Sequence, residues 1–176
     1  MIKIDEKRKF ITVNIAVLTI SDSRTLKNDT SGKFLIQSIS DLGHDVYNRQ
    51  IIKDEVHLIK KTILSWASNR NIDVIITTGG TGLTGRDSTP EVIQELANKK
   101  IEGFGELFRQ ISFNKIGSST IQSRALGAII KGTYVFALPG STNACRDAWN
   151  EILKHQLDNR HRPCNFIEIM PRLKET

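Results

Sequence analysis

Residues 74–91 have the sequence VIITTGGTGLTGRDSTPE, in which the signals of a strand, a glycine-rich loop and a helix start follow one another. The first five residues are apolar or β-branched, which is typical of a strand buried on both faces. Four glycines follow within seven residues and permit close backbone approaches that a Cβ would prevent. Ser88 or Thr89 can cap the next helix. Pro90 suits its first turn, and Glu91 completes a capping box with Ser88.

A strand, a glycine loop and a helix N-terminus together gather backbone N–H groups around an anion, usually a phosphate. Residues 80–85 match the G-x-G-x-x-G spacing of dinucleotide-binding loops, but they follow the third predicted strand rather than the first. They also have the glycine spacing of a P-loop, yet Arg86-Asp87 stands where that motif needs Lys-Ser/Thr. The stretch therefore predicts a phosphate-binding loop outside the two common nucleotide folds. The alternative is a simple tight turn.

Two further strand–helix units precede this stretch. Residues 11–20 and 46–52 are rich in β-branched residues and predict strands. Each is followed by a helical pattern, the first capped by Thr30 or Ser31 and ended by Gly43, the second beginning at Asp54. This alternation predicts an α/β fold with a mainly parallel sheet covered by helices. In such sheets ligands bind at the C-terminal ends of strands, where residues 21–22, Asp54 and the glycine loop are expected to converge.

The second half of the chain has a less regular pattern. It predicts helices over residues 103–116 and 144–157, strands over 128–131 and 133–138 around Gly132, and a short helix or loop over 118–127. The glycine loop's helix is expected to run to about Asn98. Residues 139–143 form a second loop between a strand and a helix, suited to backing a ligand or serving as a turn. We expect one domain over residues 1–176, with short irregular ends at about 1–10 and 160–176.

The composition favours a protein of the cytoplasm. The first ten residues are too charged for a signal peptide, and no apolar run approaches the length of a membrane span. Two cysteines, Cys145 and Cys164, do not suggest a disulfide framework, and Cys145 is expected in the core of the last helix. The net charge of +6 is dispersed and has few aromatics beside it, so we expect small phosphorylated ligands rather than nucleic acid or a membrane.

Four polar residues near the predicted loops have two interpretations each. Asp87 can pair with Arg86 and favour the helix terminus, or it can hold Mg²⁺ beside phosphate oxygens. Asp54 can be an ordinary helix cap, or it can belong to the ligand site. Ser123 and Arg124 can bind a phosphate, or they can cap and pair locally. The residues alone leave these alternatives open.

Several motifs resemble the MoaB/MogA family of molybdopterin-binding proteins, which includes the corresponding domain of gephyrin. They are TTGGTG at residues 77–82 with RDSTPE at 86–91, LTISD at 18–22, QSRA at 122–125 and LPGS at 138–141. EGFGELFR at 102–109, ISF at 111–113 and RPCNF at 162–166 resemble the B-type branch of that family. The resemblance extends over nearly the whole chain.

The resemblance implies a three-layer α/β/α fold, a homotrimer, and pairing of trimers into hexamers in the B-type branch. It also implies Mg²⁺-dependent transfer of AMP from ATP to the terminal phosphate of molybdopterin, with release of pyrophosphate. A phosphate nucleophile is already ionised near neutral pH, so positioning and charge neutralisation suffice. The alternative is a non-catalytic molybdopterin carrier or scaffold that contacts other molybdenum cofactor enzymes.

The resemblance also implies roles for individual residues. Asp54, Asp87 and Arg86 would be catalytic, and the two aspartates would place Mg²⁺. The nucleotide would be bound by residues of both loops: Gly79, Gly80, Thr81, Gly82, Pro139, Gly140 and Ser141. Molybdopterin would be bound by residues at the ends of neighbouring strands: Ser21, Asp22, Thr78, Ser123 and Arg124.

Overall fold

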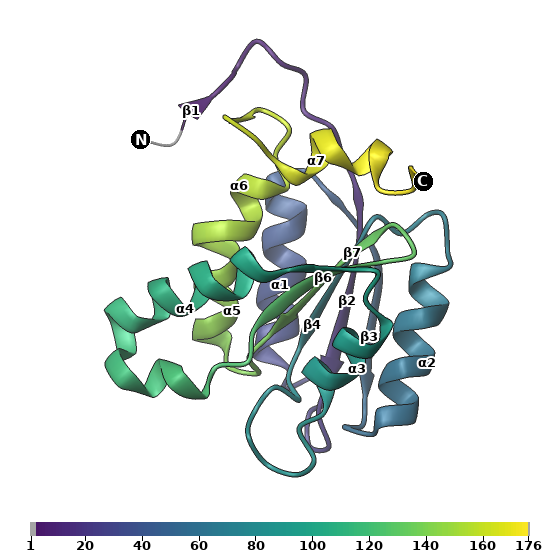
Figure 1. Ribbon diagram of the computed structural model, residues 1–176, viewed down its shortest axis with the longest axis vertical. Helices are drawn as coiled ribbons and strands as arrows, with labels where there is room; N and C mark the ends of the chain where they lie inside the picture. Colours follow the sequence, from purple (N-terminus) through teal and green to yellow (C-terminus); the bar gives the residue numbers. More distant parts are fainter. Residues whose placement is uncertain (1–2, 176) are drawn as a thin grey trace.

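A six-stranded mixed sheet forms the centre of the computed structural model, which describes residues 3–175 (Figure 1). Its strand order is β3-β2-β4-β7-β6-β5; the first four strands are mutually parallel, and β6 and β5 are antiparallel to their neighbours. The strands are β2 (Asn14–Ile20), β3 (Asp45–Ile52), β4 (Val74–Thr78), β5 (Lys99–Ile101), β6 (Leu126–Ile130) and β7 (Thr133–Leu138). The predicted α/β fold with a mainly parallel sheet is confirmed.

Helices cover both faces of the sheet and produce the three expected layers (Figure 1). One face carries α1 (Thr30–Leu42), α4 (Glu102–Ile116) and a long segment made of α5 (Thr142–Ala148), a π-helical turn (Trp149–Leu153) and α6 (Lys154–Gln156). The other face carries α2 (Val56–Ala67) and α3 (Thr89–Leu96). Each face has its own core of buried residues. No helix in the described range is long and apolar enough to cross a membrane.

The start of α1 differs from the expectation. Its N-cap is Asp29, whose carboxylate accepts a hydrogen bond from the N–H of Gly32, rather than Thr30 or Ser31. A carboxylate is among the best cap acceptors, and it satisfies a donor that the first helical turn leaves unpaired. At the other end, Gly43 adopts the left-handed conformation and ends the helix as predicted.

The predicted capping box of α3 is wrong. Ser88 is the N-cap, but its side chain makes no capping hydrogen bond, and the side chain of Glu91 pairs with Arg124 instead. Asp54 is also not a helix cap, because α2 is preceded by Glu55 at that position. Both side chains that the sequence suggested for local capping, Ser88 and Asp54, are therefore available for other contacts.

The sequence did not predict β5 or the regular structure of the chain ends. The helix expected to reach Asn98 ends at Leu96, and β5 then pairs antiparallel with β6. The ends contain short elements: β1 (Lys3–Ile4), β8 (His161–Arg162), α7 (Phe166–Ile169) and a 3₁₀ turn (Met170–Arg172). β1 and β8 pair antiparallel, so the expectation of irregular ends is corrected at these residues.

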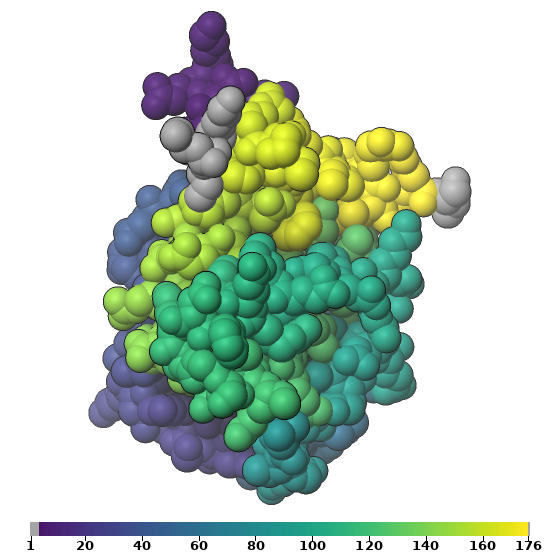
Figure 2. All heavy atoms as spheres, turned by 60° about the vertical axis from the view of Figure 1, so that its left-hand side comes forward, coloured from purple at the N-terminus to yellow at the C-terminus, as the bar shows by residue number. Residues whose placement is uncertain are grey.

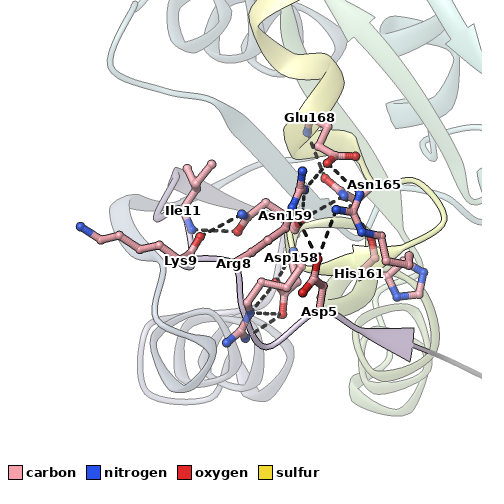
Figure 3. A network of polar contacts seen from close by, with 11 residues as sticks. Asp5, Arg8, Lys9, Ile11, Asp158, Asn159, His161, Asn165 and Glu168 are labelled. Atoms are coloured by element: carbon pink, nitrogen blue, oxygen red, sulfur yellow. Dashed lines mark hydrogen bonds and ion pairs between the residues drawn. The ribbon is translucent and has the colours of Figure 1, made fainter.

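Asn159 joins the two ends of the chain (Figure 3). Its side chain is buried, accepts a hydrogen bond from the N–H of Ile11 at 2.9 Å and donates one to the carbonyl of Lys9 at 3.0 Å. Its own carbonyl accepts from Arg8 at 3.0 Å and from Asn165 at 3.3 Å. This network lies at the N-terminal ends of the parallel strands, opposite the glycine loop (Figure 1).

Candidate functional site

The loops predicted to bind ligands meet at one edge of the sheet. Strands β2, β3, β4 and β7 are parallel, so the loops that follow them emerge on the same side. Strand β6 runs in the opposite direction, so the segment that precedes it, including Ser123 and Arg124, lies at this edge too. The sheet topology thus brings together residues that are about 100 positions apart in the sequence.

Arg86 connects three of these loops. Its guanidinium lies 3.1 Å from a carboxylate oxygen of Asp22 and donates a hydrogen bond to the carbonyl of Asp54 at 3.2 Å. The N–H of Asp54 also donates to Asp22, at 3.4 Å, and the hydroxyl of Ser88 donates to the Asp54 carboxylate at 3.5 Å. Asp54, Arg86 and Ser88 line a surface hollow of about 410 Å³, together with His57.

The carboxylate of Asp54 is in an unfavourable position for a negative charge. Burial raises its pKa above the usual value, and the nearby carboxylates of Asp87 and Asp22 raise it further, while Arg86 opposes them. A divalent cation would relieve this repulsion, and carboxylates are the ligands that Mg²⁺ prefers. No group of three or more metal-binding side chains occurs within residues 3–175. A Mg²⁺ ion here would therefore have to share its ligands with substrate phosphates and water.

Asp87 bends back onto its own loop. Its carboxylate accepts hydrogen bonds from the N–H of Thr84 at 3.0 Å and from the hydroxyl of the same residue. The Thr84 hydroxyl lowers the pKa of Asp87 below its usual range, and backbone hydrogen bonds from Thr84 and Gly82 add to that effect. Asp87 is therefore firmly ionised, and it retains lone pairs for a cation because a carboxylate can accept about four hydrogen bonds.

Two glycines allow the loop to pass close to its neighbours. Gly79 has φ +100° and Gly80 has φ +63°, both in the left-handed region that favours glycine. A Cβ on Gly79 would overlap the carbonyl oxygen of Ile20, the last residue of β2. The hydroxyl of Thr89 donates to the carbonyl of Gly79 at 3.2 Å, which fastens the loop to the start of α3.

The loop has fewer free N–H groups than the sequence suggested. The N–H of Gly79 donates to the carbonyl of Leu138 at 3.1 Å, and that of Gly82 is hydrogen-bonded to Asp87. The N–H groups of Gly80 and Thr81 have no hydrogen-bond acceptor among the described residues. These two groups are the ones that the loop can offer to a phosphate.

The loop of residues 139–141 backs the glycine loop. A Cβ on Gly140 would lie 3.3 Å from the Cα of Gly79, so the two loops pack backbone to backbone. The hydroxyl of Ser141 caps α5 by accepting a hydrogen bond from the N–H of Ala144 at 3.2 Å. Ser141 therefore has a structural task in addition to the predicted contact with the nucleotide.

Thr78 faces the protein interior rather than the solvent. Its hydroxyl donates to the carbonyl of Pro139 at 3.0 Å and lies 3.2 Å from the sulfur of Cys145. The thiol is fully buried, and burial raises its pKa to about 11, which suits the predicted core position. Thr78 thus supports the second loop, and its hydroxyl does not point toward a ligand.

Ser123 and Arg124 lie beside the glycine loop but apart from the cluster of Asp22, Asp54 and Arg86, which we call the Arg86 cluster. Arg124 donates hydrogen bonds to the carbonyls of Thr81 at 3.3 Å and Asp87 at 2.7 Å, and it pairs with Glu91. Both residues line a cavity of about 570 Å³ between α3, α4 and β6. We call it the Arg124 cavity; its other polar lining residues include Gln94, Lys100, Glu102, Glu106 and Arg109.

Comparisons with known proteins identify the family of this chain. Residues 16–159 match the family model described as a probable molybdopterin binding domain. The chain belongs to this family. It is 45% identical over 167 residues to molybdenum cofactor biosynthesis protein B of Escherichia coli, covering 95% of this chain and 96% of that protein. The MoaB/MogA resemblance inferred from the motifs is confirmed.

Solved structures of the family have the same fold as this molybdopterin-binding domain. A crystal structure of molybdenum cofactor biosynthesis protein B superposes with a TM-score of 0.86 at 37% identity, covering 96% of this chain and all of that one. The tungsten cofactor synthesizing protein MoaB from Pyrococcus furiosus superposes with a TM-score of 0.78 at 32% identity, covering 93% of this chain and 98% of that one.

The domain also contains an ion pair with a buried carboxylate, which the sequence did not predict. The carboxylate of Asp29 accepts hydrogen bonds from Arg49 at 2.9 Å, from Thr19 at 2.8 Å and from Gly32 at 2.8 Å. Burial acts to raise the pKa of Asp29, but these hydrogen bonds outweigh it, so the pKa lies below the usual value. The only sequence signal for this pair is Arg49, a charged residue in the middle of the second predicted strand. The pair anchors the end of the loop that carries Asp22.

Proposed function

We propose that this protein adenylylates molybdopterin in molybdenum cofactor biosynthesis. Family membership and the 45% identity to the Escherichia coli protein support the biosynthetic role. In the proposed step, an oxygen of the terminal phosphate of molybdopterin attacks the α-phosphorus of Mg-ATP. A new P–O bond forms, the bond to the β-phosphate breaks, and its electron pair leaves with pyrophosphate.

The cluster of Asp22, Asp54 and Arg86 beside the glycine loop is the observation that carries this proposal. The free N–H groups of Gly80 and Thr81 would bind the α-phosphate, and Arg86 would offset the charge that develops on it. Mg²⁺, when bound between Asp54, Asp87 and the nucleotide, would neutralise phosphate charge. No residue is needed to remove a proton, because the attacking phosphate is already ionised.

The Arg124 cavity is suited to the pterin. It is a partly apolar hollow with several polar side chains, as small-molecule sites usually are. The carboxylates of Glu102 and Glu106 can accept hydrogen bonds from the ring's amino and N–H groups, and Arg109 can donate to its carbonyl. Arg124 bonds to the glycine loop and lines the cavity, so a pterin bound here would hold its phosphate close to the nucleotide.

A non-catalytic carrier or scaffold is the second candidate. Arg86 already pairs with Asp22, so its guanidinium would have to release that carboxylate to act on a phosphate during transfer. A protein that only binds molybdopterin would not need this adjustment.

Pyrophosphate release from Mg-ATP, with and without molybdopterin, tests the two candidates. We expect release that requires molybdopterin, and a decrease of about 100-fold or more in D54N and D87N, the usual effect of removing an electrostatic stabiliser. D41N is the matched control, because Asp41 is an exposed residue near the far end of α1. Binding of molybdopterin without release would favour the carrier, and neither binding nor release would refute both candidates.

Self-association through α4 and the following 3₁₀ helix η1 (Gly117–Gln122) belongs to the same proposal. This surface faces the viewer in Figure 2 and has four large exposed apolar side chains: Leu107, Phe113, Ile116 and Ile121, with exposures of 42%, 58%, 56% and 84%. A second copy of the chain would bury them, as the family's trimers imply.

Sedimentation velocity measures this association directly. We expect a trimer or a hexamer for the parent and monomers for F113E and I121E, because a charge buried at an apolar interface is costly. V56E is the control, since Val56 is 52% exposed on α2, on the opposite face of the sheet. A monomeric parent, or unchanged assembly in both variants, would contradict this interface.

A further inference from the structure

A second hollow lies on the other side of the Arg86–Asp22 ion pair, between the loop that follows β2 and the end of β3. Its volume is about 480 Å³. Three cationic side chains, Arg24, Arg49 and Lys53, line it against one carboxylate, Asp22. The hydroxyl-bearing residues Ser21 and Thr25 are in the lining as well. We call it the basic hollow.

The positive charge of the basic hollow is mostly not neutralised by the protein. Asp22 is already paired with Arg86, outside the hollow. Arg24 and Lys53 have no carboxylate within 4 Å in the part of the chain that the structure describes. Arg49 pairs with the buried Asp29 through one nitrogen, while its Nε is buried and has no hydrogen-bond partner there. An anion of more than one charge would neutralise Arg24 and Lys53.

The sheet order places the basic hollow opposite the Arg124 cavity. Strand β4 carries the glycine loop, β2 and β3 lie on one side of it, and β7 and β6 lie on the other. In phosphoryl-type transfer the attacking and leaving oxygens lie roughly in line across the phosphorus. If the pterin phosphate approaches from the β6 side, as the proposed function has it, the leaving group departs toward β2 and β3.

We infer that the basic hollow binds the pyrophosphate group, first as the β- and γ-phosphates of ATP and then as the product. This inference rests on the proposed function, which gives the direction of transfer. The choice of an anionic ligand rests on Arg24 and Lys53, which have no carboxylate partner among the described residues. Arg24 and Lys53 contact the phosphate oxygens, and Arg49 holds the wall of the hollow through Asp29. The hydroxyl of Ser21 shapes the loop by accepting from the N–H of Arg24 at 3.2 Å.

Calorimetric titration with inorganic pyrophosphate in the presence of Mg²⁺ tests this site without any turnover. We expect R24Q and K53Q each to weaken pyrophosphate binding about 10-fold, and R24Q/K53Q to weaken it further, because each removes a charge-assisted contact. AMP binding should be unchanged, since AMP lacks the two phosphates. K27Q is the matched control, because Lys27 is exposed on the same loop but does not line the hollow.

Three outcomes would overturn the inference. They are a parent protein that binds no pyrophosphate at about 1 mM, a double variant that binds it as the parent does, and inorganic phosphate that binds as tightly as pyrophosphate. Failure of the proposed function looks different. Molybdopterin-dependent release would be absent, while pyrophosphate binding would still depend on Arg24 and Lys53.

Discussion

At the scale of single residues, Asp54 shows a conflict between folding and function. Its carboxylate is partly buried beside Asp22 and Asp87, and these surroundings raise its pKa. Folding therefore places a negative charge where it is unfavourable, and Arg86 and hydrogen bonds from Ser88 compensate for it only in part. Sites that are preorganised for charged ligands commonly sacrifice stability in this way.

D54N should therefore be more stable than the parent at neutral pH. The folded-state pKa lies above the unfolded value of 3.8, so the ionised group opposes folding above that folded-state pKa. Below about pH 3.8 the carboxyl is protonated in both states, and the difference disappears. We expect a gain on the order of 0.5 kcal/mol, the size of interactions between partly exposed charges. Urea unfolding at neutral pH and near pH 3 measures it; a variant less stable than the parent at neutral pH would contradict this account.

The sequence located the loops of the site but not the direction of each side chain. Thr78 belongs to the expected motif, yet its hydroxyl points into the core, next to Cys145. The sequence could not predict this orientation, because strand alternation does not reveal which face of the sheet holds Cys145. The Arg124–Glu91 and Arg49–Asp29 pairs join residues on different elements, so they depend on strand order. A local capping rule cannot anticipate such pairs, which is why it misassigned Glu91.

At the scale of elements, local patterns predicted the three β-α units because their apolar periodicity is complete within each unit. Two strands around Gly132 were also predicted, since this glycine marks the turn between them and has φ +81°. Their antiparallel pairing was not predicted, and β6 begins two residues earlier than expected. β5 was missed because two of its three residues are exposed lysines. It is a strand only because β6 offers it a free edge. The π-helical turn after α5 likewise has no local sequence signal that we recognise.

Two substitutions at Ser141 separate its role as a helix cap from its predicted role in nucleotide binding. S141A removes the cap of α5 and should cost about 1 kcal/mol of unfolding free energy. S141D keeps a capping acceptor and should unfold like the parent, but its charge should raise the KM for ATP. Chemical unfolding and ATP kinetics on both variants make the comparison. If S141D kept the parent's KM, the side chain would not lie near the nucleotide.

At the scale of the whole molecule, the chain ends and the ligand loops lie at opposite ends of the sheet (Figure 1). The Asn159 network holds the ends (Figure 3), and the cluster of Asp22, Asp54 and Arg86 joins the loops. About five strand residues separate the two, and no hydrogen bond between described side chains connects them directly. We therefore expect them to act independently.

N159A should loosen both ends while sparing the site. Loss of the Asn159 side chain leaves the N–H of Ile11 and the carbonyl of Lys9 without their partner; because both hydrogen bonds are only partly buried, we expect a cost of about 1 kcal/mol. Hydrogen exchange should become faster around Ile11 and α7, while ligand binding stays unchanged. N48A is the control, because Asn48 is exposed on β3. A variant with parental exchange rates at Ile11 would show that other contacts hold the ends.

The placement of the ends also matters for how the protein can be used. A sensor surface, an affinity tag or a second catalytic domain attached near Lys3 or Glu175 would face away from the nucleotide and pterin loops. Immobilised copies would then present those loops to the solution. A fused enzyme of the same pathway would need a linker that spans the length of the sheet, roughly 17–20 Å for a strand of five residues, before it could pass its product directly.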